Sequence, residues 1–305
     1  MYLAIAALAV GKLPTLTIGH DVQGRPVEMP LVGFLATNET ETASALAVGH
    51  RLIDTALTYD NQAAIARAIA AVGVKRDELF ISTKVPGGLG SAGTISAHEQ
   101  NLRQLNMTGV GLLLTHFPCG FPTSPGGPLV NCSKAARQST WRGLETLYKA
   151  GKARAIGVAH FCQRHIKDIL EIATVPIAVA REEWHVGMSP DPFGLVSFCR
   201  DHGISFQSSS PLCGNCGAER KELITGPLVQ RIGRAHNVTG AQVALRWLVQ
   251  SGSPVTPASA NPKHLREDLE LFNFTLSDAE MAQLNLATSP PSVELPSICK
   301  LAGGE

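Results

Sequence analysis

The 305-residue chain carries almost no net charge, and only 17% of its residues are charged. A formal charge of +1 gives no electrostatic reason to expect nucleic acid or a strongly charged surface as a partner. The low charge content, together with 44% hydrophobic residues, is typical of a compact chain with a large buried core. A chain of this length can form a single α/β barrel, which commonly fills about 250 residues.

Long hydrophobic runs are missing as well. The apolar stretch at residues 2–10 is too short to span a bilayer. It ends in small residues, as the core of a secretory signal does, but no basic residue precedes it. We therefore expect no membrane partner and a cytoplasmic location, with secretion left open as the alternative.

The usual metal and nucleotide signatures are also absent. The sequence has no H-E-x-x-H, no P-loop and no glycine-rich dinucleotide fingerprint. Cys213 and Cys216 form the only C-x-x-C, and no second pair of cysteines or histidines completes a zinc set. We expect no metal and interpret these two residues as small packed side chains. Cys119 and Cys132 flank a loop rich in proline and glycine, and whether they pair in an oxidising compartment stays open.

The chain does contain a regular alternation of apolar strand patterns and helical patterns. Such alternation implies a parallel sheet, and eight strand–helix units suggest closure into a (β/α)8 TIM barrel, which is an α/β fold. We predict one domain over 1–305, with an N-terminal extension at 1–18, a hairpin across the barrel bottom at 19–30, and a tail at 289–305 that covers the mouth or ends free. The predicted strands are 31–36, 50–54, 78–85, 110–116, 153–159, 175–180, 203–209 and 253–259. The predicted helices are 39–48, 61–72, 94–105, 134–150, 163–173, 192–202 and 240–250, followed by a helical region through 286.

Three successive predicted strands end in polar residues. Asp54, Lys84 and His116 close them in order, and Tyr59 projects from the loop after the first. Because chemistry in such barrels lies at the C-terminal ends of the strands, we expect these four side chains to meet at the mouth. A phenol is a poor acid in water, with a pKa of about 10. A neighbouring ammonium stabilises phenolate and lowers that pKa, so Lys84 could make Tyr59 a proton donor.

Several segments resemble the aldo-keto reductase superfamily. The resemblance runs from about residue 30 to 287 and is carried by HRLIDTALTYDNQ, LFISTKV, LLLTHFP, GKARAIGVAHF, GISFQSSSPL and NPKHLREDLELFNFTLSDAEM. It implies that Tyr59 protonates a carbonyl oxygen while a nicotinamide cofactor delivers hydride. It further implies that Lys84 lowers the pKa of Tyr59, that Asp54 pairs with Lys84, and that His116 orients the carbonyl or relays the proton.

The residues at the positions that bind the nicotinamide cofactor in this family differ in this sequence. A Ser-Asn pair after the fifth strand is replaced by Ala159 and His160, and a Gln of the sixth strand is replaced by Arg181. Ser209 stands where a Tyr stacks on the nicotinamide ring, which removes about 0.5–1.5 kcal/mol of binding. Ala258 stands where a Lys meets the 2′-phosphate, which removes about 1.5–3 kcal/mol, and His264 matches an Arg that often assists it.

Other cofactor positions keep suitable residues. The resemblance assigns Ser210, Leu212 and Gly214 to the loop that covers the pyrophosphate. It assigns a further phosphate contact to Ser259, and contacts with adenine or its ribose to Glu267 and Asp268. NADP or NAD is therefore the expected cofactor, unless binding has been lost altogether.

The replacements themselves suggest a further role. We expect His160, Arg181, Glu183 and His185 to converge beside Tyr59 if the fifth and sixth strands lie as in the family. Such a charged cluster could bind an anionic or polar substrate in place of the nicotinamide ring.

Three functional hypotheses follow. The first is an NAD(P)H-dependent reductase of an aldehyde or ketone. The second keeps Tyr59 and Lys84 for a redox-neutral dehydration, isomerisation or cyclisation without normal NADPH binding. The third is a binding barrel with no catalysis. All three imply a small-molecule ligand, in a pocket shaped by the loop at 117–130 and the C-terminal segment. The sequence does not determine the substrate or the oligomeric state.

Overall fold

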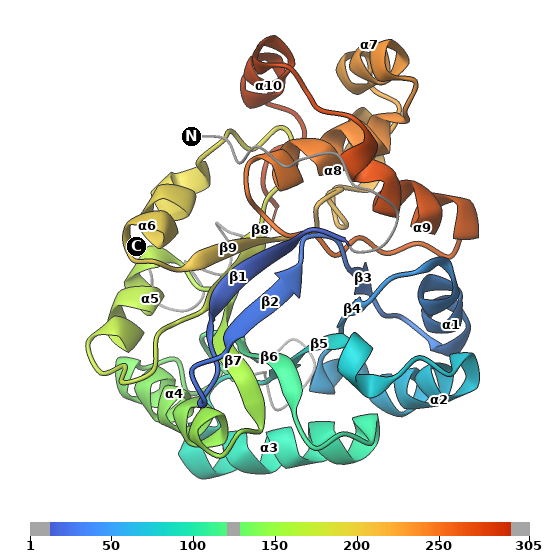
Figure 1. Cartoon of the computed structure of the whole chain (residues 1–305). Helices are drawn as coiled ribbons and strands as arrows, with labels where there is room; N and C mark the ends of the chain where they lie inside the picture. The colour runs from blue at the N-terminus through green and yellow to red at the C-terminus, as the bar shows by residue number, and fades with distance from the viewer. Residues whose placement is uncertain (1–12, 121–128, 294–305) are drawn as a thin grey trace.

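The computed structural model describes residues 13–120 and 129–293, and these form a single closed barrel of strands inside a ring of helices (Figure 1). The predicted (β/α)8 TIM barrel fold is thereby confirmed. The apolar run at 2–10, residues 121–128 of the predicted loop and the end of the C-terminal tail lie outside the described residues.

The barrel sheet contains seven parallel strands in sequence order, from β3 to β9. Two further strands form an antiparallel hairpin, which begins at Thr15 within the predicted N-terminal extension and not at residue 19 as predicted. The hairpin strands are β1 (Thr15–His20) and β2 (Pro26–Pro30). The barrel strands are β3 (Phe34–Leu35), β4 (Leu52–Asp54), β5 (Phe80–Val85), β6 (Val110–His116), β7 (Ala153–Ala159), β8 (Val179–Glu183) and β9 (Ser205–Ser209).

Helices surround the sheet, and two of them, α7 and α10, stand outside the ring (Figure 1). Most of their bounds agree closely with the predicted helices. The helices are α1 (Glu39–Val48), α2 (Gln62–Val72), α3 (Gly90–Leu105), α4 (Lys134–Lys149), α5 (Gln163–Leu170), α6 (Leu195–Asp201), α7 (Pro227–His236), α8 (Gly240–Gln250), α9 (Pro262–Leu269) and α10 (Asp278–Asn285).

The predicted eighth strand at 253–259 is reduced to a single bridging residue. Val255 forms parallel bridges to Val32 on one side and to Ser208 on the other, and so closes the barrel. Pro254 and Pro257 explain the reduction, because proline has no N–H to donate to a ladder. Their carbonyls still accept, from the amide of Ser208 at 3.1 Å and from that of Leu35 at 3.0 Å.

Two other predictions of elements were wrong. The strand predicted at 175–180 is β8, which begins four residues later because Pro176 cannot donate a ladder hydrogen bond. The segment predicted as a loop before residue 240 contains α7, which has Pro227 in its first turn and ends at Asn237 in the left-handed conformation. Both are common helix boundary signals.

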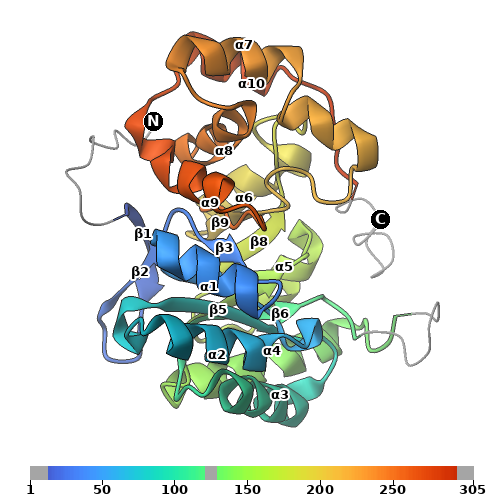
Figure 2. The same cartoon turned by 90° about the vertical axis from the view of Figure 1, so that its right-hand side faces the viewer.

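The hairpin plugs one end of the barrel. Ile18, Val27 and Met29 pack inside it against Leu52 and Leu112. Figure 2 shows β1 and β2 at the end opposite to the one at which the chain leaves β6. The interior is therefore apolar at the hairpin end, and the polar strand ends meet at the open end.

The C-terminal segment reaches the open end, as one of the two predictions for the tail proposed. The amide of Val293 and the hydroxyl of Ser292 both donate to Oε2 of Glu183, at the end of β8. Among residues 13–120 and 129–293, no helix is both long and apolar enough to cross a bilayer.

Candidate active site

Tyr59 is held by a short, well-bonded connection after β4. It ends the 3-10 helix Leu57–Tyr59, and its amide donates to the carbonyl of Ala56. Asn61 anchors the turn from behind, because its side chain accepts from Thr55 and donates to the carbonyl of Ala36. The Tyr59 side chain is 37% exposed, so its hydroxyl lies at an open surface on a fixed backbone.

Lys84 lies directly beneath Tyr59. Its ammonium is 5.0 Å from the centre of the Tyr59 ring, within the range of a cation–π contact. The same nitrogen donates to Oδ2 of Asp54 at 2.7 Å and to the carbonyl of Thr55 at 2.8 Å. The side chains of Lys84 and Asp54 are completely buried. A buried, fixed positive charge thus stands next to the phenol, as the strand order predicted.

Arg181 adds a second cation to the same carboxylate. It belongs to β8, across the barrel from β4, and its Nη2 lies 3.3 Å from Oδ2 of Asp54. The guanidinium also reaches the hydroxyl of Thr256 at 3.5 Å. Burial raises the pKa of the Asp54 carboxyl, but the charges of Lys84 and Arg181 outweigh it and hold that pKa below its usual range. Asp54 is therefore ionised and shared between two cations.

The two histidines at the mouth are neutral. Burial, reinforced by the charges of His160, Lys84 and Arg181, holds the pKa of His116 well below its ordinary value. Burial and the charge of Arg181 lower the pKa of His160 to about 3. The rings of His116 and His160 are 5.2 Å apart, and Phe117 stacks on His116 at 4.1 Å. Each imidazole can therefore offer one N–H donor without adding charge.

A cavity of about 550 Å³ opens above these groups. Tyr59, His116, His160, Arg181 and Ser209 line its inner part, whereas Lys84 and Asp54 lie behind them. The structure thus brings the four predicted catalytic residues and the three altered nicotinamide positions to one place. The outer wall consists of loop residues after β9 and around Val255, among them Ser210, Leu212, Gly214, Asn215, Arg220 and Ala258.

The outer wall suits the phosphates of a dinucleotide. Ser210, Leu212 and Gly214 lie there as predicted. Arg220, which the sequence did not single out, also lines the cavity and can meet phosphate charge. It lies on the 3-10 helix Gly217–Leu223, and only the folded loop shows where its side chain points.

The nicotinamide end is less suited. Ser209 is buried at the predicted place, so the described lining offers no aromatic face where the resemblance expects one. Arg181 and the neutral His160 can still donate hydrogen bonds to a carboxamide oxygen. The residues present therefore fit a dinucleotide, with weaker hold on the ring than an aromatic platform would provide.

The three predicted adenine-side residues lie outside the cavity lining. The Ser259 hydroxyl accepts from the amide of Asn261 and lies 3.3 Å from Nδ1 of His264. Glu267 pairs with Lys263 at 3.6 Å. Burial, with the charge of Glu267, raises the pKa of Asp268 to about 7. Lys263 thus supplies a cation next to the positions that the resemblance assigns to the 2′-phosphate.

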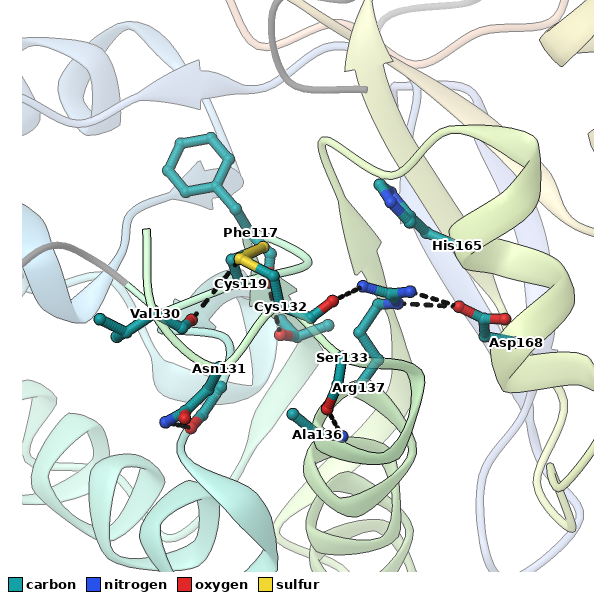
Figure 3. The surroundings of a disulfide bond; sticks show 12 residues. Phe117, Cys119, Val130, Asn131, Cys132, Ser133, Ala136, Arg137, His165 and Asp168 are labelled. Carbon is teal, nitrogen blue, oxygen red and sulfur yellow. Dashed lines mark hydrogen bonds and ion pairs between the residues drawn. A yellow bond between two sulfur atoms is a disulfide. The ribbon is translucent and has the colours of Figure 1, made fainter. Parts of the chain in front are cut away.

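The loop after β6 is braced at its base (Figure 3). Cys119 and Cys132, whose pairing the sequence left open, form a disulfide with their Cα atoms 4.5 Å apart. Arg137 donates to the carbonyl of Cys132 and forms an ion pair with Asp168 at 2.6 Å. Phe117 at the start of this loop lines the cavity, as expected for a loop that shapes the pocket.

Two predictions about polar groups were wrong. Glu183 and His185 do not line the cavity beside Tyr59; they face each other at 3.6 Å at the end of β8. Cys213 and Cys216, interpreted as unpaired packing residues, are joined as a disulfide beside His185. Oε2 of Glu183 is held by Ser292 and Val293, and Nδ1 of His185 lies at the carbonyl of Val186, and residue spacing does not report such contacts.

Comparison with known proteins agrees with this geometry. The model of the aldo/keto reductase family matches residues 37–288. The chain is 34% identical over 271 residues to 2,5-diketo-D-gluconic acid reductase B of Corynebacterium sp. (strain SHS752001), covering 87% of this chain and 90% of that protein. It is 34% identical over 290 residues to morphine 6-dehydrogenase of Pseudomonas putida, covering 90% and 91%.

A solved structure has the same fold. Aldose reductase from Schistosoma japonicum superimposes with a TM-score of 0.78 at 28% identity, covering 91% of this chain and 94% of that one.

Proposed function

The chain belongs to the aldo/keto reductase family, and from this premise we propose that it reduces an aldehyde or ketone with NADPH or NADH. One observation carries the proposal. The Tyr59 phenol lies at the cavity, above the buried ammonium of Lys84, which in turn is bonded to Asp54. This arrangement provides a proton donor with fixed positive charge behind it, which carbonyl reduction requires.

Each residue of the site has a distinct task in this proposal. Tyr59 donates its proton to the carbonyl oxygen, and Lys84 stabilises the phenolate that remains. Neutral His116 directs an N–H toward the same oxygen and orients the carbonyl. Asp54 holds the Lys84 ammonium in place. A bound nicotinamide dinucleotide would supply the hydride, and its pyrophosphate would lie against the loop with Ser210, Leu212 and Gly214.

We further propose that the substrate carries a polar or anionic group. Arg181 and Arg220 both line the cavity, and the neutral His160 can donate a hydrogen bond. Guanidinium groups bind carboxylates through paired hydrogen bonds. The relative named for 2,5-diketo-D-gluconic acid supports an acid with a carbonyl group as the substrate class.

The proposal is tested by titrating NADPH and NADH while the protein's tryptophan fluorescence is recorded, and then by assaying carbonyl acids and their neutral amides as substrates. We expect saturable binding of at least one dinucleotide, oxidation of that dinucleotide on addition of substrate, and faster turnover of the acids. Absence of saturable binding up to millimolar concentrations of both dinucleotides would contradict the proposal.

A redox-neutral reaction is the second candidate, and the nicotinamide end of the site favours it. Where a nicotinamide would lie, Arg181 contributes a buried cation and Ser209 provides no aromatic ring. A cation beside the ring disfavours the oxidised cofactor, which is itself positively charged. This candidate predicts that the combined variant His160→Asn, Arg181→Gln, Ser209→Tyr and Ala258→Lys gains NADPH binding that the natural chain lacks. Tight binding of NADPH by the natural chain rules it out.

A further inference from the structure

A cluster of metal-ligand side chains lies behind the cavity wall and takes no part in the chemistry proposed above. His185 follows β8, and Cys213 and Cys216 lie in the loop after β9. Their ligand atoms all lie within 4.8 Å of one another, and all three side chains are buried. The sequence showed only the C-x-x-C; the fold supplies the histidine.

The hydrogen bonding of His185 determines which ring nitrogen carries the hydrogen. Nδ1 lies 2.8 Å from the carbonyl oxygen of Val186, and because a carbonyl only accepts, Nδ1 must carry a hydrogen. In the neutral ring, Nε2 therefore carries the lone pair that a metal ion would take. This atom is fully buried and has no hydrogen-bond partner among the described residues.

Glu183 places a negative oxygen next to His185. Its Oε1 lies 3.6 Å from Nε2 of His185, while its Oε2 accepts from Ser292 and Val293. A carboxylate oxygen and a nitrogen lone pair repel each other at this separation unless a proton or a metal ion lies between them. The burial of the group makes an unsatisfied arrangement more costly.

The donor set selects the cation. Two thiolates in C-x-x-C spacing and one imidazole are three of the four tetrahedral ligands that Zn²⁺ takes. A metal-binding histidine usually donates its other N–H to a carbonyl or carboxylate, as Nδ1 does here. We propose that Cys213, Cys216 and His185 supply three ligands to one thiophilic divalent ion, with Zn²⁺ as the preferred ion.

The cysteines must be reduced before they can bind metal, because the structure joins them as a disulfide. A trialkylphosphine and water supply the two electrons and two protons that convert the disulfide into two thiols, and the phosphine becomes its oxide. Metal binding then releases the thiol protons. Because Leu212, Gly214 and Asn215 line the cavity between and beside these cysteines, a bound ion would tie the cavity wall to the end of β8.

The test uses the full chain, reduced with phosphine under anaerobic conditions, freed of metal by a chelator and titrated with Co²⁺ and then Zn²⁺. We expect one equivalent of Co²⁺, thiolate-to-cobalt charge transfer with the intensity of two thiolates, tetrahedral ligand-field bands, and displacement of Co²⁺ by Zn²⁺. The melting temperature should rise when Zn²⁺ is added.

Variants assign the ligands. Cys213→Ser, Cys216→Ser and His185→Gln should each weaken Zn²⁺ binding by about 100-fold or more. Cys162→Ser is the matched control, since Cys162 lies 3.3 Å from Nδ1 of His165 but has no second cysteine at this spacing, and it should leave binding unchanged. A disulfide that persists after phosphine treatment, no metal uptake by the reduced chain, or a cobalt spectrum without thiolate charge transfer would overturn the proposal. The wild-type spectrum gives this answer even if a variant fails to fold.

Discussion

The carboxylate of Asp54 holds two buried cations, so replacing it should destabilise the protein severely. Lys84 Nζ lies 2.7 Å and Arg181 Nη2 3.3 Å from the same oxygen, and all three side chains are at most 4% exposed. At an effective dielectric constant of about 20, the two attractions amount to roughly 6 and 5 kcal/mol before desolvation. Breaking a buried pair on one side typically costs about 3–5 kcal/mol. We expect Asp54→Asn to lower the free energy of unfolding by at least that amount.

Removing one of the two cations should have a much smaller effect. Arg181→Gln leaves Asp54 paired with Lys84 and relieves the repulsion between the two cations. We therefore expect it to change the free energy of unfolding by about 1 kcal/mol or less. Arg137→Gln is the matched control, because Arg137 and Asp168 form a buried one-to-one pair at 2.6 Å. Arg137→Gln leaves the buried carboxylate of Asp168 without its cation and should lower the free energy of unfolding by about 3 kcal/mol.

The double variant measures the coupling directly. Asp54→Asn with Arg181→Gln leaves one unpaired cation where Asp54→Asn alone leaves two, so it should be more stable than Asp54→Asn by about 1–3 kcal/mol. Denaturant unfolding at constant m-value is the assay. Two results would refute the conclusion that Lys84 and Arg181 share the Asp54 carboxylate. One is a cost of 3 kcal/mol or more for Arg181→Gln, and the other is a double variant whose cost equals the sum of the two single costs within about 0.5 kcal/mol. Because the pKa of Asp54 is lowered on folding, its contribution is present above about pH 4 and is lost as the pH falls through the folded value.

Four further outcomes are expected. Tyr59→Phe should lower turnover by about 10²–10⁴-fold without loss of stability, because the hydroxyl makes no hydrogen bond within the described residues; unchanged turnover would favour a non-catalytic barrel. Ser209→Tyr should tighten dinucleotide binding by about 2–10-fold in a fluorescence titration, through ring stacking. Ala258→Lys should shift preference toward NADPH by about 10–100-fold, measured as the ratio of the two dissociation constants. Asp268→Asn should stabilise the protein by about 4 kcal/mol at pH about 8 and not at pH about 4, since a folded pKa of about 7 means that stability falls as the pH rises from about 4 to 7.

The meeting of the candidate catalytic residues was predictable because strand order determines position in a barrel. Asp54, Lys84 and His116 lie at the ends of β4, β5 and β6, which are neighbours in both sequence and space. Side chains at the ends of adjacent parallel strands must meet at one edge. Local patterns also placed most helices, since apolar spacing and capping residues act within a few residues of each other.

The ends of strands depended on hydrogen bonds that the apolar pattern does not report. Val255 alone bridges where a full strand was predicted, and β8 continues through Glu182 and Glu183. Apolar content indicates burial, whereas ladder bonds need an N–H at each alternate position, which proline lacks. Burial of charged residues in β8 depends on partners from other strands.

Only the tertiary structure decided the contacts between distant parts of the chain. Arg181 spans the barrel to reach Asp54, and His185 meets Cys213 and Cys216 after the chain leaves the axis. Such contacts depend on side-chain length and direction within a closed barrel, and neither spacing nor composition specifies them. The sequence alone determined the barrel and its candidate proton donor, since these arise from repeated short patterns. Which charges surround that donor was decided by packing across the barrel.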